Sequence, residues 1–336
     1  MTSKRFMKIS FPILVLVGIY FLGPTPEEPK YILTKPSLPS DPVALERFVR
    51  AEDAKHKIKP GNEAEIVWVD SSRTKTAYGI VYLHGFSASK MEGEPAHRNL
   101  AKAFGCNLFL ARLADHGVDT TETLLYYSAD RSWESAKQAI AIAKQIGDKV
   151  IVLSTSTGGT LALKLAAEYP EDVHALINLS PNIAINDGAA FLLNDPYGLY
   201  IARTVLGDRY RTTGASPEHA KYWNKKYRIE SLTQLEELLE TTMTKNTFSR
   251  VKQPSLTLYY YKDEGSQDPE VKVSAMLEMH EQLGTPRELK SAIAFPNAGA
   301  HVIGSAMTSK DFDGVYRAME KFMIDVLKIE KVNRTP

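Results

Sequence analysis

Hydrophobic residues gather along this chain in short continuous runs rather than in strict alternation with polar ones. Seven runs rich in Val, Ile, Leu and Tyr are candidate β-strands: 65–70, 77–86, 106–113, 149–155, 173–180, 255–261 and 291–296. Continuous apolar runs of this length are typical of strands that are buried on both faces of a sheet. The pattern therefore predicts a sheet with helices on both sides.

Between these runs the apolar positions recur at helical spacing. The spacing predicts a polar helix over 41–57, with Asp41 as its cap and Pro42 in its first turn. Further helices are predicted at 95–104, 131–146, 159–168, 272–283 and 311–327. Strand–helix alternation of this kind favours a mostly parallel sheet with right-handed crossovers, which is the α/β class.

One interval, 181–253, breaks the alternation. It holds no convincing strand, whereas 188–207 and 230–243 favour helices. A connection this long predicts an inserted helical cap, placed above the carboxyl ends of the strands, where such sheets bind ligands. The expected organisation is a core of residues 29–180 and 254–336, with the cap of 181–253 inserted between its two parts.

Residues 1–28 depart from this globular pattern. Lys4, Arg5 and Lys8 precede an uncharged apolar run over 9–23, which is the design of a secretory signal or an uncleaved anchor. The run is short for a bilayer core, which needs about 20 residues, but no small-x-small cleavage site is evident. We expect a membrane anchor with the folded domain extracytoplasmic (periplasmic), the alternative being secretion after cleavage.

Composition excludes several classes of function. Lys and Arg number 41 and Asp and Glu 40, so the chain carries no electrostatic footprint for nucleic acid. A single cysteine, Cys106, excludes an internal disulfide and a cysteine-based metal cluster. We expect Cys106 to act as a small buried hydrophobe.

Candidate chemistry lies in the stretch VIVLSTSTGGTLAL, residues 150–163, where a strand turns into a helix. A tight, strained turn demands small residues on either side of its apex. Counting from Ser156, Gly158 lies at plus two and Gly159 at plus three; counting from Ser154, the glycines come too late. Ser156 is therefore the candidate nucleophile, although a plain strand-to-helix turn would show the same short pattern.

This S-x-S-x-G stretch resembles the G-x-S-x-G nucleophile elbow of the α/β-hydrolases, with Ser154 in place of the first glycine. The resemblance implies an acid and then a histidine, each just after a later strand. His301, in the loop FPNAGAHVIGS, has the expected position. Asp268 begins a D-x-x-V turn before a helix and is the expected acid, with Asp263 as the alternative. The downstream His174, His219 and His280 are interpreted as ordinary residues.

Two earlier loops extend the resemblance. His84-Gly85-Phe86 resembles the H-G-x oxyanion loop, which implies that the backbone N–H groups of Phe86 and Thr157 bind the oxyanion, that Gly85 lets the backbone approach the substrate and that His84 is structural. The segment around His116 is similar to the G-H-G loop of carboxylesterases and monoacylglycerol lipases, with Asp115 replacing its first glycine. We expect His116 to hold its loop, with a role in the substrate pocket as the alternative.

The residues that carry the resemblance lie within 65–328, including a helix similar to the D-W-x-x-D helix of the same enzymes, in which Trp133 packs. The resemblance implies hydrolysis of a small-molecule carboxylic ester through an acyl-enzyme on Ser156, without a metal or organic cofactor. Cleavage of an amide, thioester or carbon–carbon bond and perhydrolase chemistry remain alternatives, because a fold alone does not settle a substrate. A membrane-anchored, non-catalytic protein that binds a small ligand under the cap is the alternative of another class.

Overall fold

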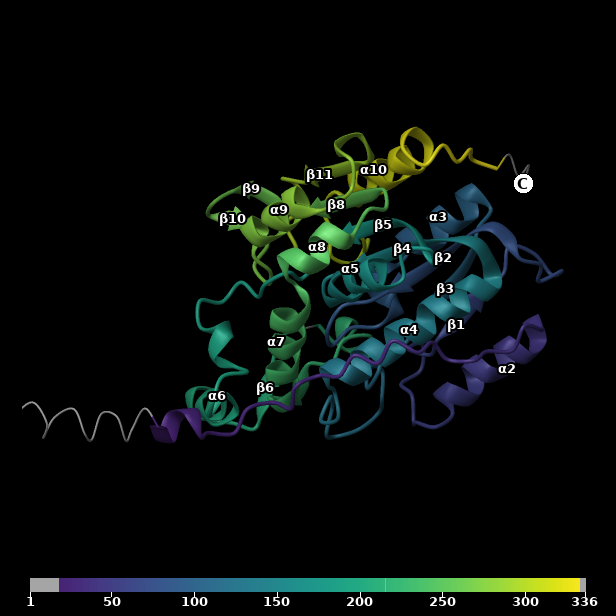
Figure 1. The fold of residues 1–336 in the computed structure, drawn as a ribbon. Helices are drawn as coiled ribbons and strands as arrows, with labels where there is room; N and C mark the ends of the chain where they lie inside the picture. The colour runs from purple at the N-terminus through teal and green to yellow at the C-terminus, as the bar shows by residue number, and fades with distance from the viewer. Residues whose placement is uncertain (1–17, 215, 333–336) are drawn as a thin grey trace, which may run out of the picture.

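The computed structural model describes residues 18–214 and 216–332. Its centre is a seven-stranded sheet in the order β1-β3-β2-β4-β5-β8-β11 (Figure 1). β1 is antiparallel to β3 and all other pairs are parallel, so the α/β class predicted from the sequence is confirmed. The strands are β1 (Glu65–Val67), β2 (Thr76–Leu83), β3 (Asn107–Leu110), β4 (Gly147–Thr155), β5 (Val173–Leu179), β8 (Ser255–Tyr259) and β11 (Lys290–Ala294).

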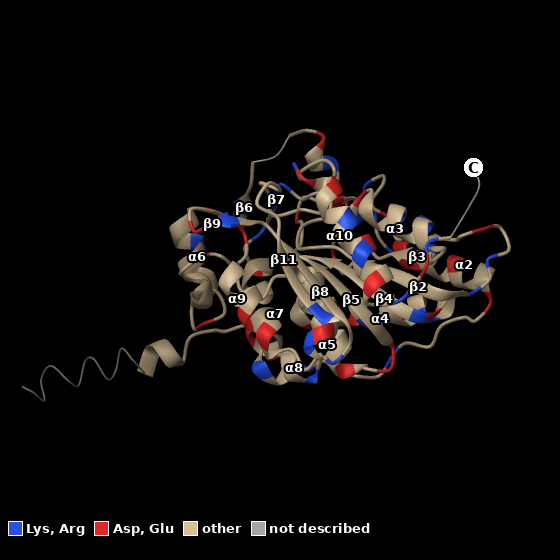
Figure 2. Cartoon of the chain, turned by 90° about the horizontal axis from the view of Figure 1, so that it is seen from above, with Lys and Arg blue, Asp and Glu red and all other residues tan. Residues whose placement is uncertain are grey.

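Helices cover both faces of the sheet, and each face packs into its own hydrophobic core. In the central strands, Val81 and Val152 point into one core while their neighbours Ile80 and Ile151 point into the other, because successive strand residues face opposite sides. Figure 2 shows the charged residues concentrated on the helices and loops around the sheet. One face is covered by α3 (Ala96–Phe104) and α10 (Phe312–Asp325), and the other by α2 (Pro42–Asp53), α4 (Ala129–Ile146), α5 (Thr157–Glu168), α8 (Lys245–Arg250) and α9 (Val273–Gln282).

The interval 181–253 holds helices, as expected, but also a small sheet that the sequence pattern did not predict. β6 (Tyr210–Thr212) pairs antiparallel with β7 (Lys226–Arg228); strands of three residues, mostly polar, carry no apolar signature. The helix predicted over 188–207 is interrupted around Tyr197, whose φ is +61°. The interval's helices besides α8 are η2 (Ala190–Leu192), α6 (Gly198–Leu206), η3 (His219–Lys221) and α7 (Glu230–Thr242).

The chain before α2 runs as an extended strap along α4 (Figure 1). The fully buried Trp133 donates its indole N–H to the carbonyl of Ile32 at 2.9 Å, and Lys137 Nζ donates to the carbonyls of Ile32 and Thr34. Most of the predicted anchor falls on residues 1–17, which lie outside the described residues. Within 18–214 and 216–332, no helix combines the length and apolar character needed to cross a membrane.

Candidate active site

The turn between β4 and α5 has the geometry of a nucleophile elbow. Its apex is Ser156, with φ +53° and ψ −122°, a conformation that is strained for a residue with a side chain. A Cβ on Gly158 would lie 2.0 Å from the carbonyl oxygen of Leu83, and one on Gly159 would lie 2.5 Å from Cβ of Pro181. Both glycines are therefore required by close packing of the helix start against β2 and the chain after β5.

The two serines of this turn have different surroundings. Ser154 is fully buried within β4 and donates its hydroxyl to Oδ1 of Asn178 on the neighbouring strand, at 2.7 Å. Ser156 lies one step beyond the strand and is 8% exposed. The Ser154 hydroxyl thus joins β4 to β5, whereas Ser156 lies just beyond the carboxyl end of the central strand β4.

We predict that Gly158→Ala destabilises the protein by at least about 2 kcal/mol, because the new methyl group meets a backbone oxygen that cannot move freely. Gly188→Ala is the matched control, since nothing lies within 4 Å of its added Cβ. It should change stability by no more than about 0.5 kcal/mol. Urea unfolding followed by circular dichroism measures both. Equal stability of the two variants would show that the packing at the elbow is looser than described.

Asp268 and His301 are joined directly. Nδ1 of His301 lies 2.7 Å from Oδ2 of the fully buried Asp268, whose Oδ1 accepts the N–H groups of Glu270 and Val271. Asp263 is exposed at the end of β9 (Tyr261–Asp263), in a hairpin with β10 (Ser266–Gln267). Of the two acids that the sequence left open, the structure places Asp268 against the histidine.

The pair biases each partner toward its charged form. Burial alone would raise the pKa of Asp268, but the His301 charge and the three hydrogen bonds to the carboxylate lower it. Burial would likewise lower the pKa of His301, but Asp268 first, then Glu92 and Glu270, raise it above 6.5. A proton held on Nδ1 by Asp268 leaves Nε2 as the basic nitrogen.

Two buried, neutral histidines shape the neighbouring loop. Nε2 of His84 accepts the N–H of Leu113 at 3.1 Å, so Nδ1 carries the proton and donates to the carbonyl of Gly85 at 2.9 Å. Nε2 of His116 accepts the N–H of Ser87 at 3.0 Å. Burial lowers the pKa of both rings, to about 4 for His116. Both rings therefore hold the loop by hydrogen bonds and remain neutral at pH 7.

The predicted oxyanion loop passes beside the elbow. A Cβ built on Gly85 would lie 2.9 Å from Cβ of Ser156, so the following amide, that of Phe86, belongs to a peptide adjacent to the candidate nucleophile. Thr157 begins α5, where N–H groups lack intrahelical acceptors. The Phe86 ring packs edge-to-face on Tyr127 and on Tyr227 of β7, with centroids 5.2 Å apart in each pair.

One buried carboxyl at this site was missed by sequence reasoning. Glu92, in η1 (Lys90–Gly93), is 2% exposed, and its Oε2 accepts the N–H of Gly85. The segment SKMEGEP has one apolar side chain, Met91, among charged and turn-forming residues and is typical of an exposed loop, so no sequence signal distinguishes Glu92 from a surface acid. Only its burial beside the oxyanion loop sets it apart.

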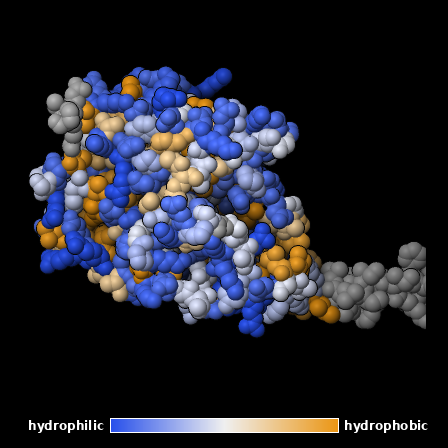
Figure 3. Space-filling model, turned by 180° about the vertical axis from the view of Figure 1, so that it is seen from behind, coloured by the Kyte–Doolittle hydropathy of each residue, from blue (hydrophilic) through white to orange (hydrophobic). Residues whose placement is uncertain are grey.

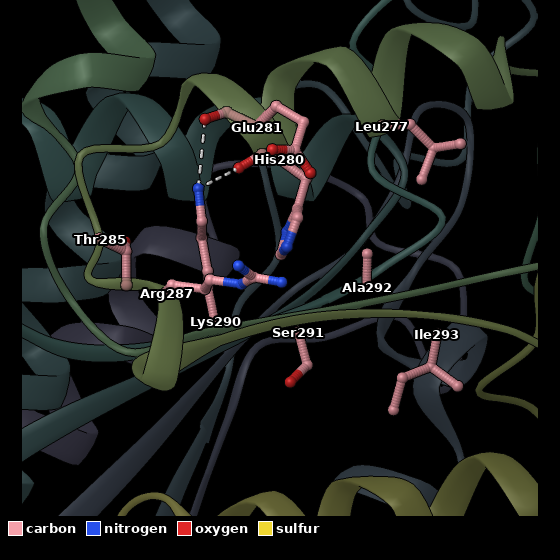
Figure 4. Close-up of a pocket in the computed structure, with 9 residues that line it drawn as sticks. All are labelled: Leu277, His280, Glu281, Thr285, Arg287, Lys290, Ser291, Ala292 and Ile293. Atoms are coloured by element: carbon pink, nitrogen blue, oxygen red, sulfur yellow. Dashed lines mark hydrogen bonds between the residues drawn. The ribbon is translucent and has the colours of Figure 1, made fainter.

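A hollow of about 850 Å³ lies elsewhere, between α9 and β11 (Figure 4). Lys290 Nζ spans it to the carbonyl of His280, at 2.7 Å, and to that of Glu281, at 3.2 Å. None of Ser156, Asp268 and His301 lines it, so it is separate from the candidate active site. In the described part of the chain, no three His, Cys, Asp or Glu side chains are grouped to hold a metal ion.

Structural comparison agrees with this fold. One of the metagenome-derived lipolytic enzymes LipS and LipT superposes with a TM-score of 0.64 at 17% identity, covering 80% of this chain and 100% of that one. A monoacylglycerol lipase of Paleococcus ferrophilus gives 0.57 at 13% identity, covering 78% and 99%. A soluble variant of monoglyceride lipase from Saccharomyces cerevisiae gives 0.58 at 12% identity, covering 78% and 90%. At these identities the likeness establishes the fold.

The family follows from the sequence itself. No curated protein sequence matches the chain significantly. The family model described as serine aminopeptidase, S33, matches residues 80–296, which is more than half of the chain and contains Ser156 and Asp268. The resemblance inferred from the motifs is confirmed, and the chain belongs to the serine aminopeptidase S33 family of α/β-hydrolases.

Proposed function

We propose that this protein is a serine hydrolase that cleaves a carboxylic ester through an acyl-enzyme on Ser156. The observation that carries the proposal is the 2.7 Å contact between His301 Nδ1 and buried Asp268, which lies at the same end of the sheet as the elbow of Ser156, beyond the carboxyl ends of the parallel strands. A serine hydroxyl is a poor nucleophile until a histidine accepts its proton, and that histidine needs a carboxylate to orient it. The chain provides all three groups.

The reaction proceeds in two halves. Ser156 Oγ attacks the ester carbonyl and His301 Nε2 takes the hydroxyl proton, while Asp268 stabilises the imidazolium. The Phe86 and Thr157 amides bind the developing oxyanion. The tetrahedral intermediate collapses, His301 returns the proton to the departing alcohol, and the acyl group stays on Ser156. A water molecule, deprotonated by the same imidazole, then attacks the acyl-enzyme. The second tetrahedral intermediate collapses, His301 returns the proton to Ser156 Oγ, and the acid is released.

We expect the acyl group to lie against apolar side chains beside the oxyanion loop. Phe86 adjoins a cluster in which Tyr127 of the core meets Tyr227, Leu235 and Leu239 of the interval 181–253. An apolar wall with few polar groups suits an aliphatic or aromatic acyl chain. The lipolytic and monoacylglycerol-lipase activities of the similar structures support an ester as the substrate class.

The choice between ester and amide is tested with matched acyl groups. We expect p-nitrophenyl butyrate and octanoate to be hydrolysed, and the p-nitroanilides of the same acids, like aminoacyl p-nitroanilides, to be cleaved at least about 100-fold more slowly in kcat/KM. The release of nitrophenol or nitroaniline measures both. Faster cleavage of the aminoacyl anilides would replace this proposal by a peptidase. Ligand binding without turnover of either series would favour the non-catalytic alternative.

We propose in addition that residues 1–23 attach the chain to a membrane with the catalytic domain outside the cytoplasm. In their described end, the side chains of Ile19, Phe21 and Leu22 are 50–86% exposed, and Figure 3 shows hydrophobic surface beside this end. Tyr197, next to α6, donates its N–H to the carbonyl of Pro24. Cell fractionation with N-terminal sequencing tests the proposal: a soluble mature protein beginning after residue 23 would indicate a cleaved signal instead.

A further inference from the structure

Glu92 is a buried carboxyl group that the mechanism above leaves unused. It is 2% exposed, and no Lys or Arg among the described residues forms an ion pair with it; its hydrogen-bond partners are the amide of Gly85, the phenol of Tyr82 and the indole of Trp223. Burying a carboxyl group without a cationic partner costs free energy. Groups of this kind gather at functional sites more often than elsewhere.

The position of Glu92 relative to the nucleophile follows from Gly85. The point where a Gly85 Cβ would lie is 2.9 Å from Oε1 of Glu92 and 2.9 Å from Cβ of Ser156. The carboxyl group and the nucleophile thus flank the same glycine. Tyr82 OH lies 3.5 Å from Oε2 of Glu92 and 2.9 Å from Oγ1 of Thr155, the residue before the nucleophile.

The oxyanion loop is held from two sides. Glu92 accepts the Gly85 N–H, and Nδ1 of His84 donates to the Gly85 carbonyl. That carbonyl and the N–H of Phe86 belong to one peptide plane. Fixing both sides of Gly85 therefore fixes the direction in which the Phe86 N–H points, and an oxyanion donor is effective only when it is aimed in advance.

We propose that Glu92 is a positioning residue of this site, which aims the Phe86 amide through Gly85 and, when ionised, acts electrostatically on His301. The inference rests on the proposed function, since it assigns Glu92 to the machinery of Ser156. Glu92 acts through the loop and through the imidazole, and the proton is transferred between Ser156 and His301 alone.

Besides aiming the amide, ionised Glu92 favours the protonated form of His301. Three carboxyl groups act on this imidazole: Asp268, Glu92 and Glu270. Glu92 in turn faces Tyr82, the imidazole and the indole of Trp223, and burial raises its pKa to about 7. Once ionised, Glu92 stabilises the imidazolium, so it raises the pKa of His301. Because catalysis needs neutral His301, the charge moves the acid limb of activity to higher pH.

Two variants of Glu92 separate its two roles. Glu92→Gln keeps an acceptor for the Gly85 amide but loses the charge, so we expect plateau kcat within about threefold of wild type and an acid limb of kcat/KM at least about 0.5 pH unit lower. Glu92→Leu loses the acceptor as well, and we expect kcat to fall about 10- to 100-fold with little change in KM, since a misaimed donor weakens transition-state binding.

Glu236→Gln is the matched control. Glu236, in α7, is 7% exposed, and burial raises its pKa to about 7 as well, but it does not act on His301. We expect the acid limb of this variant to match that of wild type. An unshifted limb in Glu92→Gln, or an equal shift in Glu236→Gln, would overturn the electrostatic role. Wild-type kcat in Glu92→Leu would overturn the positioning role, and Glu92→Gln remains informative if Glu92→Leu does not fold.

Two further measurements compare wild type with Glu92→Gln without an ester substrate. The pH dependence of covalent labelling of Ser156 by a fluorophosphonate follows the imidazole directly, and NMR titration of the His301 ring does so without any reaction. Both should shift to lower pH in Glu92→Gln. Absence of labelling in the wild-type protein at every pH would refute the proposed function, whereas an unchanged His301 titration in Glu92→Gln would refute the role of Glu92 alone.

Discussion

Ser156→Ala should reduce ester hydrolysis by about 10⁴- to 10⁶-fold in kcat, the scale seen when a serine hydrolase loses its nucleophile. The methyl side chain fits the same strained turn, where φ is +53°, so the fold and the oxyanion amides are retained. The residual rate then reports on binding and oxyanion stabilisation alone. Initial rates with p-nitrophenyl butyrate measure the loss, and fluorophosphonate labelling should disappear with it.

Ser154→Gly is the matched control for this experiment. It restores the glycine of the family motif and removes a hydroxyl group that bonds Asn178 inside the sheet. We expect labelling and most activity to remain, with a moderate loss of stability of about 1 kcal/mol from the unpaired Asn178 amide oxygen. If Ser154→Gly abolished labelling and Ser156→Ala retained it, the elbow would have to be shifted by two residues.

Asp268→Asn should lower kcat by about 10⁴-fold, as the equivalent change does in serine proteases. Both carboxylate oxygens of Asp268 accept hydrogen bonds: Oδ2 from His301, and Oδ1 from the amides of Glu270 and Val271. An asparagine side chain has one acceptor oxygen. It can serve the loop or the imidazole but not both, and the ring loses the anion that stabilises its charged form.

Asp263→Asn is the control, because Asp263 is exposed in the β9–β10 hairpin, where its Oδ1 accepts the amide of nearby Gly265. We expect its kcat to match that of wild type. We compare kcat at a pH well above the acid limb, where His301 is neutral in every variant. Thermal unfolding checks that each variant is folded. A larger loss in Asp263→Asn than in Asp268→Asn would reverse the assignment of the acid.

Much of the sheet was predictable because the residues within each strand are enough to identify it. Strands buried on both faces must be apolar at every position, so Val150, Ile151, Val152 and Leu153 mark β4 without reference to any other segment. The elbow was predictable for a similar reason, since the tight turn leaves no room for a side chain at position 158 and the sequence has glycine there. All seven strands of the central sheet were predicted, although the edge strands β1 and β11 are only partly buried.

Elements whose stability depends on distant partners were not predictable. β6 and β7 are short and polar, and the ring of Tyr210 is covered by Lys226 and by Arg228 of the facing strand. The helix expected over 188–207 is interrupted before Gly198, where an added Cβ would meet the carbonyl oxygen of Leu192 at 2.2 Å. Neither feature has a periodic signature, because neither is specified by neighbours along the chain.

By itself, the sequence determined the α/β class, from the alternation of strands and helices. It also determined the candidates Ser156 and His301 and their order along the chain, since each depends on residue type at a fixed place after a strand. Tertiary structure alone showed that Asp268, and not Asp263 five positions earlier in the same acidic stretch, contacts His301. It alone also distinguished Glu92 from a surface acid. The physical reason is the same in both cases: a carboxyl group acquires its role from burial and from the groups it faces across the fold, and neither is written in the spacing of residues along the chain.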